Sequence, residues 1–398
     1  MKFCIAGKNE IALYGVELLL SLGIEKSNIF CLVNKTDSGN HTWQPSFKKF
    51  CIDNNLLIVQ QSDLYAISDL IFISLEYDQI IKTKQFLSDK LYNIHFSLLP
   101  AYKGMFTSIL PIMKGETYSG VTLHKIDDGI DTGDIIDQIK FDIPFGITGY
   151  GLYLKYLFYS KKLLRKNILN ILNSFHDSIK QPILNSSYYA KNEISFDDFR
   201  ISFYKTCFEV CNFVNAFSFR PYQLPEFKGH KIVKAFPSEQ RSSGRPGIVV
   251  DEAKYTINVS TIDYNVRLLK NNLDETLITA SNNDIENIKY FHSLGYPLDE
   301  KNNRGWSPLI VASYHGGLEV VKYLVETCLI DINQFNNNGT TVLMYAMTYA
   351  VKTDDLSILE FLIQNGADIN QKDFFGKGLK EYALEYKNQT VIQYLNKY

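Results

Sequence analysis

The last third of the chain repeats itself, and this repetition constrains the fold more than any other feature of the sequence. A glycine turn followed by two apolar-faced segments occurs at 299–326 and again at 333–370, with weaker copies at 273–299 and 370–395. A spacing of roughly 33 residues is typical of units built from a turn and two short helices. One such unit cannot bury its own apolar face, so the copies must stack and the outer ones must act as caps. The sequence therefore predicts an all-α repeat domain.

The two strongest copies carry a recognisable pattern. The stretches GWSPLIVASYHGGLEVVKYLVE (305–326) and LIQNGADIN (362–370) closely resemble ankyrin repeats. Ankyrin modules mostly bind proteins through a concave face. The resemblance therefore implies a partner protein or a contact between two copies of this chain, and we expect a homodimer.

The first half of the chain alternates strand-like and helix-like segments. Apolar or β-branched runs lie at 2–7, 28–34, 56–60, 70–75 and 92–96, with helical patterns at 9–23 and 46–55 and a charged helical stretch before 92. The run LIFISL at 70–75 is apolar throughout, which is typical of a strand buried on both faces of a parallel sheet. The alternation predicts an open, doubly wound (Rossmann-like) α/β domain with its ligand site at the carboxyl ends of the strands.

Two further strands, a long helix and a change of texture follow. The strands are expected at 119–126 and 134–143 around a polar hairpin, and the helix from about 148 to 178. Pro182 and the polar residues 185–187 mark a boundary, after which prolines and glycines divide the chain into short segments. We therefore expect three domains: a catalytic domain at 1–185, a small, mostly β domain at 186–262 and the repeats at 263–398.

Composition and charge exclude several classes of function. The formal net charge is −2 and the pI is near 6.4, so the chain offers no general attraction to nucleic acid. The first residues do not read as a signal peptide, and no apolar run approaches the length of a membrane span. Six scattered cysteines without a CxxC pair favour reduced thiols in a cytoplasmic protein over disulfides or a zinc site.

The stretch NIHFSLLPAYKG at 93–104 carries the most informative chemistry. Side chains alternate along a strand, so Asn93 and His95 face the same way just before the turn at Pro100. Further along, the glycine-bracketed loop DGIDTGD at 128–134 can present Asp131, and its spacing differs from that of an EF-hand calcium loop. Each residue alone would be interpreted as structural, but their combination predicts a catalytic site.

Together these motifs resemble the N10-formyltetrahydrofolate-dependent formyltransferases, over about residues 1 to 240. The matching residues are Asn93-x-His95, the following 97–100 and 131–134. The resemblance implies that Asn93, His95 and Asp131 form a catalytic triad and that N10-formyltetrahydrofolate is the cosubstrate. It also implies a folate pocket that includes Ser74, Leu75, Glu76, Tyr77, Asp127 and Gly129.

The chemistry of formyl transfer suits these residue types. The nucleophile is a neutral amine, so a group that titrates near pH 7, such as His95, must accept its proton. The tetrahedral intermediate carries an oxyanion, which the Asn93 amide or His95 itself could stabilise. Asp131 would orient His95 and could pass the proton to the departing folate nitrogen. No metal and no covalent intermediate are required.

Three acceptors compete within this family. A tRNA acceptor calls for a basic C-terminal domain, which this slightly acidic chain lacks. Glycinamide-ribonucleotide enzymes are usually one compact domain, so the extra modules weigh against that acceptor. The loop after the first strand lacks GxGxxG, which disfavours a dinucleotide, although its Lys8 could meet a diphosphate.

The third acceptor is a nucleotide-linked amino sugar. Residues 215–237 look like the segment with which sugar N-formyltransferases hold the nucleotide of a dTDP-sugar. Phe217, Phe219, Arg220 and Tyr222 offer stacking faces and a fork for phosphate, and Tyr222 is the expected base-stacking residue. The alternative for any one of these side chains is a place in a small aromatic core.

The whole arrangement resembles bacterial dTDP-3-amino-3,6-dideoxyhexose N-formyltransferases, which act in O-antigen biosynthesis. The resemblance favours an amine on carbon 3 and leaves the gluco and galacto epimers open. A dTDP-4-amino-4,6-dideoxyglucose N-formyltransferase is the alternative. A non-catalytic ankyrin interaction protein is the alternative of another class, and it would predict a broken triad, whereas all three triad residues are present.

One residue of the repeats departs from the ankyrin pattern. Trp306 follows Gly305 at a position that usually holds a small threonine. A large aromatic side chain there, near Tyr314 and His315 of the same repeat, could stack on a flat ligand. This suggests a second nucleotide-sugar site with a regulatory role.

Overall fold

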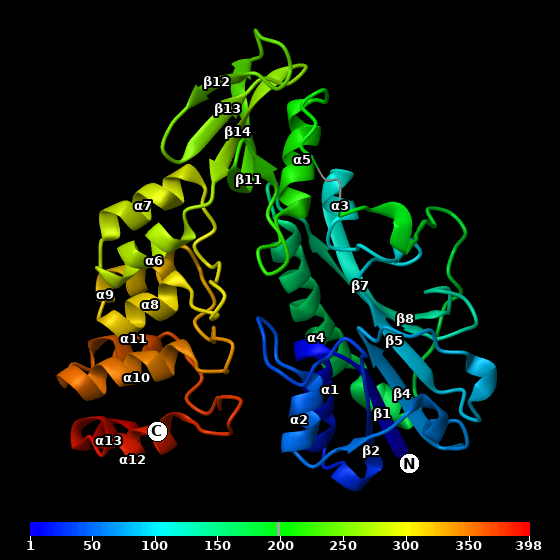
Figure 1. Ribbon diagram of the computed structural model, residues 1–398. Helices are drawn as coiled ribbons and strands as arrows, with labels where there is room; N and C mark the ends of the chain where they lie inside the picture. Colours follow the sequence, from blue (N-terminus) through cyan, green and yellow to red (C-terminus); the bar gives the residue numbers. More distant parts are fainter. Residues whose placement is uncertain (197–199) are drawn as a thin grey trace. The chain divides into compact units, whose positions relative to one another are not determined.

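The computed structural model describes residues 1–196 and 200–398, which divide into two compact units (Figure 1). The first unit comprises Met1–Asn40 and Ser46–Lys270, and the second comprises His41–Pro45 and Asn271–Tyr398. The second unit begins at Asn271 because the residues before it form the last strand of a small sheet in the first unit.

A seven-stranded sheet forms the centre of the first unit. Its order is β3-β2-β1-β4-β5-β7-β8, from β1 (Lys2–Gly7), β2 (Ile29–Val33), β3 (Leu57–Ile58), β4 (Leu70–Leu75), β5 (Leu91–His95), β7 (Tyr118–Lys125) and β8 (Ile135–Asp142). β1 to β5 are parallel, and β7 and β8 continue the sheet antiparallel. Every residue of β4 is buried, as its apolar run predicted. The strand order reverses between β1 and β4, where such sheets bind ligands, so the predicted doubly wound domain is confirmed.

Helices pack against this sheet. They are α1 (Asn9–Ser21), α2 (Phe47–Asp53) and α4 (Gly149–Asn173), whereas the short helix α3 (Leu110–Met113) packs on a later helix, Cys207–Phe217. α4 packs along β7 and β8 and contacts α1, where Lys161 forms an ion pair with Glu10 (Figure 1). The first turn of α4 is fixed by Thr148, whose hydroxyl accepts a hydrogen bond from the N–H of Gly151.

Two expected helices differ from the prediction. α4 ends at Asn173, short of 178, because Ser174 turns left-handed (φ +55°) and the following chain pairs with the edge of β8 through Ile179. The charged stretch before residue 92 forms a single 3-10 turn (Thr83–Gln85) instead of the expected helix. A residue later in this stretch bonds to a neighbouring strand: the Ser88 hydroxyl donates to the carbonyl of Leu70 in β4.

A smaller, five-stranded antiparallel sheet completes the first unit. Its order is β10-β11-β14-β13-β12, from β10 (Glu226–Phe227), β11 (His230–Arg241), β12 (Val249–Glu252), β13 (Thr256–Val259) and β14 (Tyr264–Lys270). Helix α5 (Cys207–Phe217), which the sequence had not indicated, packs on β11 and β14 and supplies Val210 and Val214 to the shared apolar core. Two short strands, β6 (Lys103–Gly104) and β9 (Tyr188–Tyr189), pair in parallel elsewhere in this unit.

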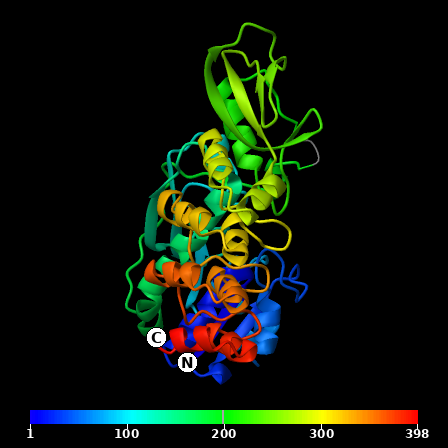
Figure 2. The same ribbon diagram turned by 90° about the vertical axis from the view of Figure 1, so that its left-hand side faces the viewer.

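The second unit is a stack of helix pairs (Figure 2). They are α6 (Leu273–Ser281) with α7 (Ile285–Leu294), α8 (Pro308–His315) with α9 (Leu318–Lys322), α10 (Val342–Thr353) with α11 (Ser357–Gln364), and α12 (Leu379–Tyr386) with α13 (Gln389–Leu395). The first helices of successive pairs pack on one another, and so do α7, α9 and α11. Ser307 and Thr341 cap α8 and α10 at equivalent positions, as repeated units require. The predicted repeat domain is confirmed.

The repeat glycine has a steric role. Gly305 has φ +80°, and a Cβ at this residue would lie 2.5 Å from the backbone nitrogen of Asn337 in the next repeat. The close approach of adjacent turns therefore requires glycine. The segment His41–Pro45 also belongs to this unit, with the His41 ring stacked on Phe374 at 4.5 Å between ring centroids.

Three absences hold within residues 1–196 and 200–398. No helix there is both long enough and apolar enough to cross a bilayer, and no group of three or more His, Cys, Asp or Glu side chains is arranged to hold a metal ion. All six cysteines, which lie in this part of the chain, are unpaired.

Candidate active site

The predicted amide and imidazole lie at the carboxyl end of β5. In the register of the sheet, Asn93 is paired with Ser74 of β4 on one side and with His124 of β7 on the other. The two neighbouring strands therefore hold Asn93 and His95 in place. The side chain of His95 is only 10% exposed.

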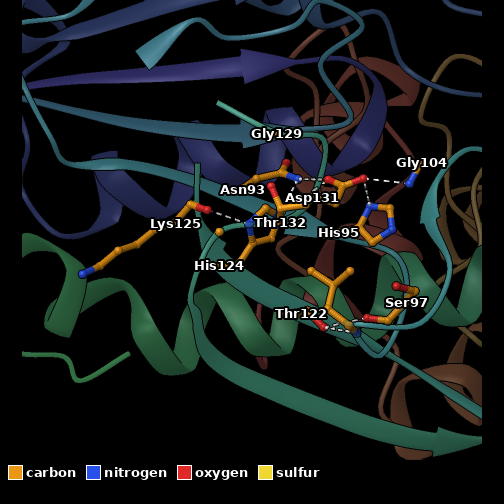
Figure 3. Close-up of polar contacts among 12 residues, drawn as sticks. Asn93, His95, Ser97, Gly104, Thr122, His124, Lys125, Gly129, Asp131 and Thr132 are labelled. Carbon is orange, nitrogen blue, oxygen red and sulfur yellow. Dashed lines mark hydrogen bonds and ion pairs between the residues drawn. The ribbon is translucent and has the colours of Figure 1, made fainter. Parts of the chain in front are cut away.

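The Asp131 carboxylate joins these two side chains (Figure 3). One oxygen, Oδ1, accepts a hydrogen bond from the Asn93 amide at 3.3 Å. The other, Oδ2, accepts from the backbone N–H of Gly104 at 2.9 Å and lies 3.4 Å from Nδ1 of His95. Asp131 therefore contacts both Asn93 and His95, the two residues with which the sequence predicted it to form a triad.

The loop between β7 and β8 is shaped to present Asp131. Asp131 has φ +54°, a left-handed conformation that is uncommon for residues other than glycine and needs support from its surroundings. Within the loop, Asp127 accepts hydrogen bonds from the Gly129 N–H at 3.1 Å and the Thr132 hydroxyl at 2.7 Å. A Cβ on Gly133 would lie 1.8 Å from the carbonyl oxygen of Lys125, so the loop can close this tightly only with glycine there.

The hydrogen bonds of His95 determine its tautomer. Its Nε2 lies 2.7 Å from the carbonyl oxygen of Tyr102, which can only accept, so Nε2 carries the proton. Burial lowers the pKa of His95, while Asp131 and the Tyr102 carbonyl act in the opposite direction. At neutral pH the ring is therefore uncharged, and the lone pair of Nδ1 is available as a base.

The Asp131 carboxyl is ionised under the same conditions. Burial alone would raise its pKa, but His95 and the Gly104 N–H together lower the pKa of Asp131 below its ordinary value. The site thus pairs a carboxylate with a neutral imidazole. If Nδ1 of His95 gains a proton, each ring nitrogen has an acceptor, and the imidazolium is stabilised where it forms.

His124 is a site residue that the sequence reasoning missed. Its Nδ1 lies 2.7 Å from the carbonyl of Lys125, and its Nε2 lies 3.1 Å from the Asn93 amide and 3.6 Å from Asp131. The Lys125 carbonyl can only accept, so Nδ1 donates and Nε2 receives the amide proton. The sequence did contain a signal, because His124 lies one residue before the end of β7, the strand that leads into the Asp131 loop.

The residues predicted to bind folate fall into two groups. Ser74 and Leu75 are buried at the end of β4, and Tyr77 packs against the apolar cluster beneath the sheet. Asp127 and Gly129 lie on the same loop as Asp131.

Glu76, at the end of β4, is the most distinctive of the predicted folate-binding residues. It has φ +61°. The Tyr153 hydroxyl donates to its carboxylate and lies 3.0 Å from Oε2 and 3.2 Å from Oε1. Burial raises the pKa of Glu76, and the charge of Lys8 opposes this shift. Lys8 follows β1, and Glu76 follows β4, so the two residues lie together at the point where the strand order reverses. Lys8 was predicted to meet a diphosphate.

The residues predicted to hold a nucleotide are only partly accessible. Phe217 is 2% exposed and packs on Phe213, so it belongs to the apolar interior. Arg220 is half-buried, and Tyr222 is 65% exposed with its ring 5.0 Å from that of Phe219. Phe219 in turn lies 5.7 Å from the ring of Tyr153, the tyrosine bonded to Glu76. A continuous line of side chains therefore runs from the end of β4 to Tyr222.

The aromatic residues singled out in the repeats also lie close together. Trp306 and Tyr314 both approach the ring of Tyr345, at 6.3 and 5.8 Å between ring centroids, and Tyr314 lies 5.0 Å from His315. The ring of Trp306 is half-buried, with the Arg304 guanidinium 5.9 Å from its centroid.

Comparison with known proteins agrees with both parts of the fold. A formyl transferase family model matches residues 65–168, and a model of three ankyrin repeats matches residues 277–373. Methionyl-tRNA formyltransferase of Malacoplasma penetrans is 26% identical over 277 residues, which cover 67% of this chain and 86% of the relative.

Two solved structures are more similar. WlaRD, a sugar 3N-formyl transferase crystallised in the presence of dTDP and 5-N-formyl-THF, is 44% identical, with a TM-score of 0.64 over 68% of this chain and 98% of its own. The N-formyltransferase from Helicobacter canadensis, in complex with folinic acid and dTDP-3-aminofucose, is 40% identical, with a TM-score of 0.64 over 68% of this chain and 100% of its own. Almost the whole of each relative is matched, while about a third of this chain has no counterpart in them.

Proposed function

This chain belongs to the sugar N-formyltransferases, and we propose that it transfers the formyl group of N10-formyltetrahydrofolate to the amine of a dTDP-linked amino-dideoxyhexose. The observation that carries this proposal is the near-complete match to two enzymes crystallised with a formylated folate and with dTDP or a dTDP-amino sugar. The geometry around His95 supports the chemistry, since it supplies a neutral base beside a carboxylate.

The favoured acceptor is a 3-amino sugar, either dTDP-3-amino-3,6-dideoxyglucose or its galacto epimer. The support is that one relative is a 3N-formyl transferase and the other was crystallised with dTDP-3-aminofucose. A product of this kind suits O-antigen biosynthesis. dTDP-4-amino-4,6-dideoxyglucose remains the alternative acceptor. The homodimer and the cytoplasmic location expected from the sequence also stay predictions.

The proposed reaction begins at Nδ1 of His95. The neutral sugar amine attacks the formyl carbon of the folate, and a new C–N bond forms while one amine proton passes to Nδ1. The resulting imidazolium is held between the Tyr102 carbonyl and the Asp131 carboxylate, which lie 2.7 and 3.4 Å from its nitrogens. The same proton then moves to N10 of the folate as the C–N10 bond breaks, so tetrahydrofolate leaves and His95 is neutral again.

Asn93 is the proposed donor to the oxyanion of the tetrahedral intermediate. Its amide nitrogen has two protons, one directed at His124 (3.1 Å) and the other at Asp131 (3.3 Å). In this proposal the longer contact, to Asp131, is exchanged for the formyl oxygen. His124 then holds the amide in its orientation while the negative charge develops.

The line of side chains from Glu76 to Tyr222 is the proposed site for the nucleotide sugar. Tyr222 is the largely exposed ring in this line and would stack on the thymine. Lys8 would meet the diphosphate, and Arg220 would assist it. Phe217 is not included, because its ring is enclosed by the apolar interior.

A panel of acceptors tests the proposed function. The full-length protein is incubated with N10-formyltetrahydrofolate and, separately, dTDP-3-amino and dTDP-4-amino dideoxyhexoses of both configurations, and products are detected by mass spectrometry. We expect a product heavier by one CO with a 3-amino sugar. A product with only a 4-amino sugar would replace the favoured acceptor by the alternative. No product with any sugar would contradict the proposed function, and amines of purine ribonucleotides would be tested next.

We propose that the repeats hold a second nucleotide-sugar site, with a regulatory role, at Trp306, Tyr314 and His315. The support is the cluster that these rings form with Tyr345. Trp306→Ala should lower the number of dTDP-sugar molecules bound per chain by one in equilibrium dialysis and change the steady-state kinetics. Tyr386→Ala, which removes an exposed ring from another repeat, is the matched control. If Trp306→Ala changes neither quantity, the repeats bind a protein partner or serve another role.

A further inference from the structure

The segment 181–189, between α4 and the small sheet, contacts both flanks of the His95–Asp131 pair. We call this segment the strap. It is part of neither large sheet, and the sequence reasoning treated it as a domain boundary. We propose that the strap is a positioning element for catalysis, and that Gln181 and Ser187 are its positioning residues. The inference rests on the proposed formyl transfer for its kinetic tests.

The first contact of the strap is with the loop that carries the carboxylate. The side-chain nitrogen of Gln181 donates to the carbonyl oxygens of Asp131 and Gly133, both at 2.8 Å. These two peptides flank the tight part of the loop, where Asp131 has its left-handed conformation. Gln181 therefore fixes the backbone to which the catalytic carboxylate is attached.

The chain just before the strap is itself anchored. Ile179 and Ile135 exchange two backbone hydrogen bonds of 2.8 Å at the start of β8. This bridge places Gln181 two residues further on, directly opposite the Asp131 loop. The position of Gln181 is thus set by the edge of the main sheet and does not depend on a flexible tether.

The second contact is with the peptide that bonds His95. The peptide between Tyr102 and Lys103 accepts the His95 hydrogen bond at its carbonyl, and its N–H donates to the carbonyl of Ser187 at 2.9 Å. The Ser187 hydroxyl also accepts from the N–H of Tyr102 at 2.8 Å. Since Tyr102 is in a left-handed conformation (φ +57°), these two bonds hold the carbonyl in the direction that His95 requires.

The third contact is with the remaining donor to Asp131. β9, at the end of the strap, pairs with β6, and the N–H of Met105 donates to the carbonyl of Tyr189 at 3.0 Å. β6 contains Gly104, whose N–H donates to the Asp131 carboxylate. One short segment therefore supports the backbone of Asp131, the carbonyl that binds His95 and the amide that binds Asp131. A relative shift of about 1 Å between such groups can cost about 10²-fold in rate.

The kinetic test uses full-length variants assayed with the best acceptor of the panel. Gln181→Met removes the donor at nearly constant volume, and Ser187→Ala removes the hydroxyl. We expect each to lower kcat by about 10- to 100-fold, with KM for both substrates within about twofold of the unmodified protein. Ser187→Thr, which keeps the hydroxyl, should restore kcat.

Ile183→Ser is the matched control, because Ile183 lies on the strap but is 94% exposed. It should leave kcat unchanged. The proposal is overturned if Gln181→Met and Ser187→Ala both keep kcat within about twofold, or if Ile183→Ser lowers kcat as much as they do. Failure of Ser187→Thr to recover kcat would also overturn it.

A second measurement needs no substrate, so it separates this inference from the proposed function. NMR of histidine-labelled full-length protein gives the pKa of His95, assigned with His95→Gln. Gln181→Met loosens Asp131, and Ser187→Ala loosens the Tyr102 carbonyl. Each of these groups favours the protonated ring of His95, so both variants should lower the His95 pKa. Unchanged His95 titration in both variants would overturn the role of the strap. If the unmodified protein formylates no sugar but the pKa shifts occur, the proposed function fails and the strap is upheld.

Discussion

At the scale of single residues, the site is built from groups whose protonation states complement one another. His95 is kept neutral by burial, while Asp131 is kept ionised by the charges and donors around it. A neutral base beside a carboxylate costs less to charge than an isolated buried imidazole, because the new positive charge meets a fixed negative one. The distance of 3.4 Å between Nδ1 and Oδ2 places that charge where the proton arrives.

Asp131→Asn tests this relation. The amide is isosteric and its oxygen can still accept from Gly104, but the negative charge is lost. Since that charge favours the imidazolium, we expect the His95 pKa to fall below its already lowered value, and kcat to fall by about 10²-fold or more. NMR titration and steady-state kinetics measure the two effects.

Asp128→Asn is the control for this change. It removes the same charge from the same loop, but Asp128 is an exposed partner of Lys84. Its kcat should stay within about twofold of the unmodified protein, because exposed ion pairs contribute little. An unchanged or raised His95 pKa in Asp131→Asn would contradict the assigned role of the carboxylate.

At the scale of elements, the short strand β6 connects the site to the rest of the first unit. Gly104 lies in this strand with φ +86°, and a Cβ there would lie 2.3 Å from the carbonyl oxygen of Tyr189 in β9. A side chain would separate the two strands and withdraw the N–H from Asp131. Gly104 is therefore needed for its conformation, for the close pairing and for the carboxylate contact.

Gly104→Ala should accordingly lower kcat by about 10²-fold and destabilise the protein. Gly229→Ala is the matched control: Gly229 has φ +78°, but nothing among the described residues lies within 4 Å of an added Cβ. Both variants carry the left-handed penalty of about 1–2 kcal/mol, measured by urea unfolding. Only Gly104→Ala should lose activity. Equal kcat in the two variants would show that the β6–β9 pairing has no catalytic role.

The elements also show what the sequence could and could not predict. The bounds of the strand predicted from the run LIFISL agree with those of β4, and the Asn93–His95 pair lies at the end of a strand, as expected. Both predictions were possible because apolar runs and side-chain alternation are local signals. His124 and Gln181 were missed, since their roles depend on strand register and on a loop returning to the sheet. α4 was predicted too long because the pairing of Ile179 with β8, a distant contact, outweighs local helix propensity.

At the scale of the whole molecule, the chain consists of two units with separate cores. The candidate catalytic residues, the strap and the proposed nucleotide site all belong to the first unit. The three rings of the proposed regulatory site belong to the second. The two kinds of segment can be told apart in the sequence, because a repeat and an alternating α/β pattern have different periods.

Hydrogen exchange with mass spectrometry can locate the ligands on these units. A folate inhibitor together with dTDP should protect peptides that cover 91–105, 127–134 and 181–189, since bound ligands suppress local opening. If the repeats hold a second site, dTDP without the folate inhibitor should also protect peptides that cover 302–315. Protection confined to the second unit would contradict the assignment of the catalytic site.

The most direct test of the central claim compares His95→Gln with the unmodified protein, with the best acceptor and saturating N10-formyltetrahydrofolate. Glutamine can keep a hydrogen bond to the Tyr102 carbonyl but cannot take a proton at neutral pH. If His95 is the base that deprotonates the sugar amine, kcat falls by at least about 10²-fold while the folate still binds. A variant that forms the formylated sugar at a rate within a few-fold of the unmodified protein would contradict the account.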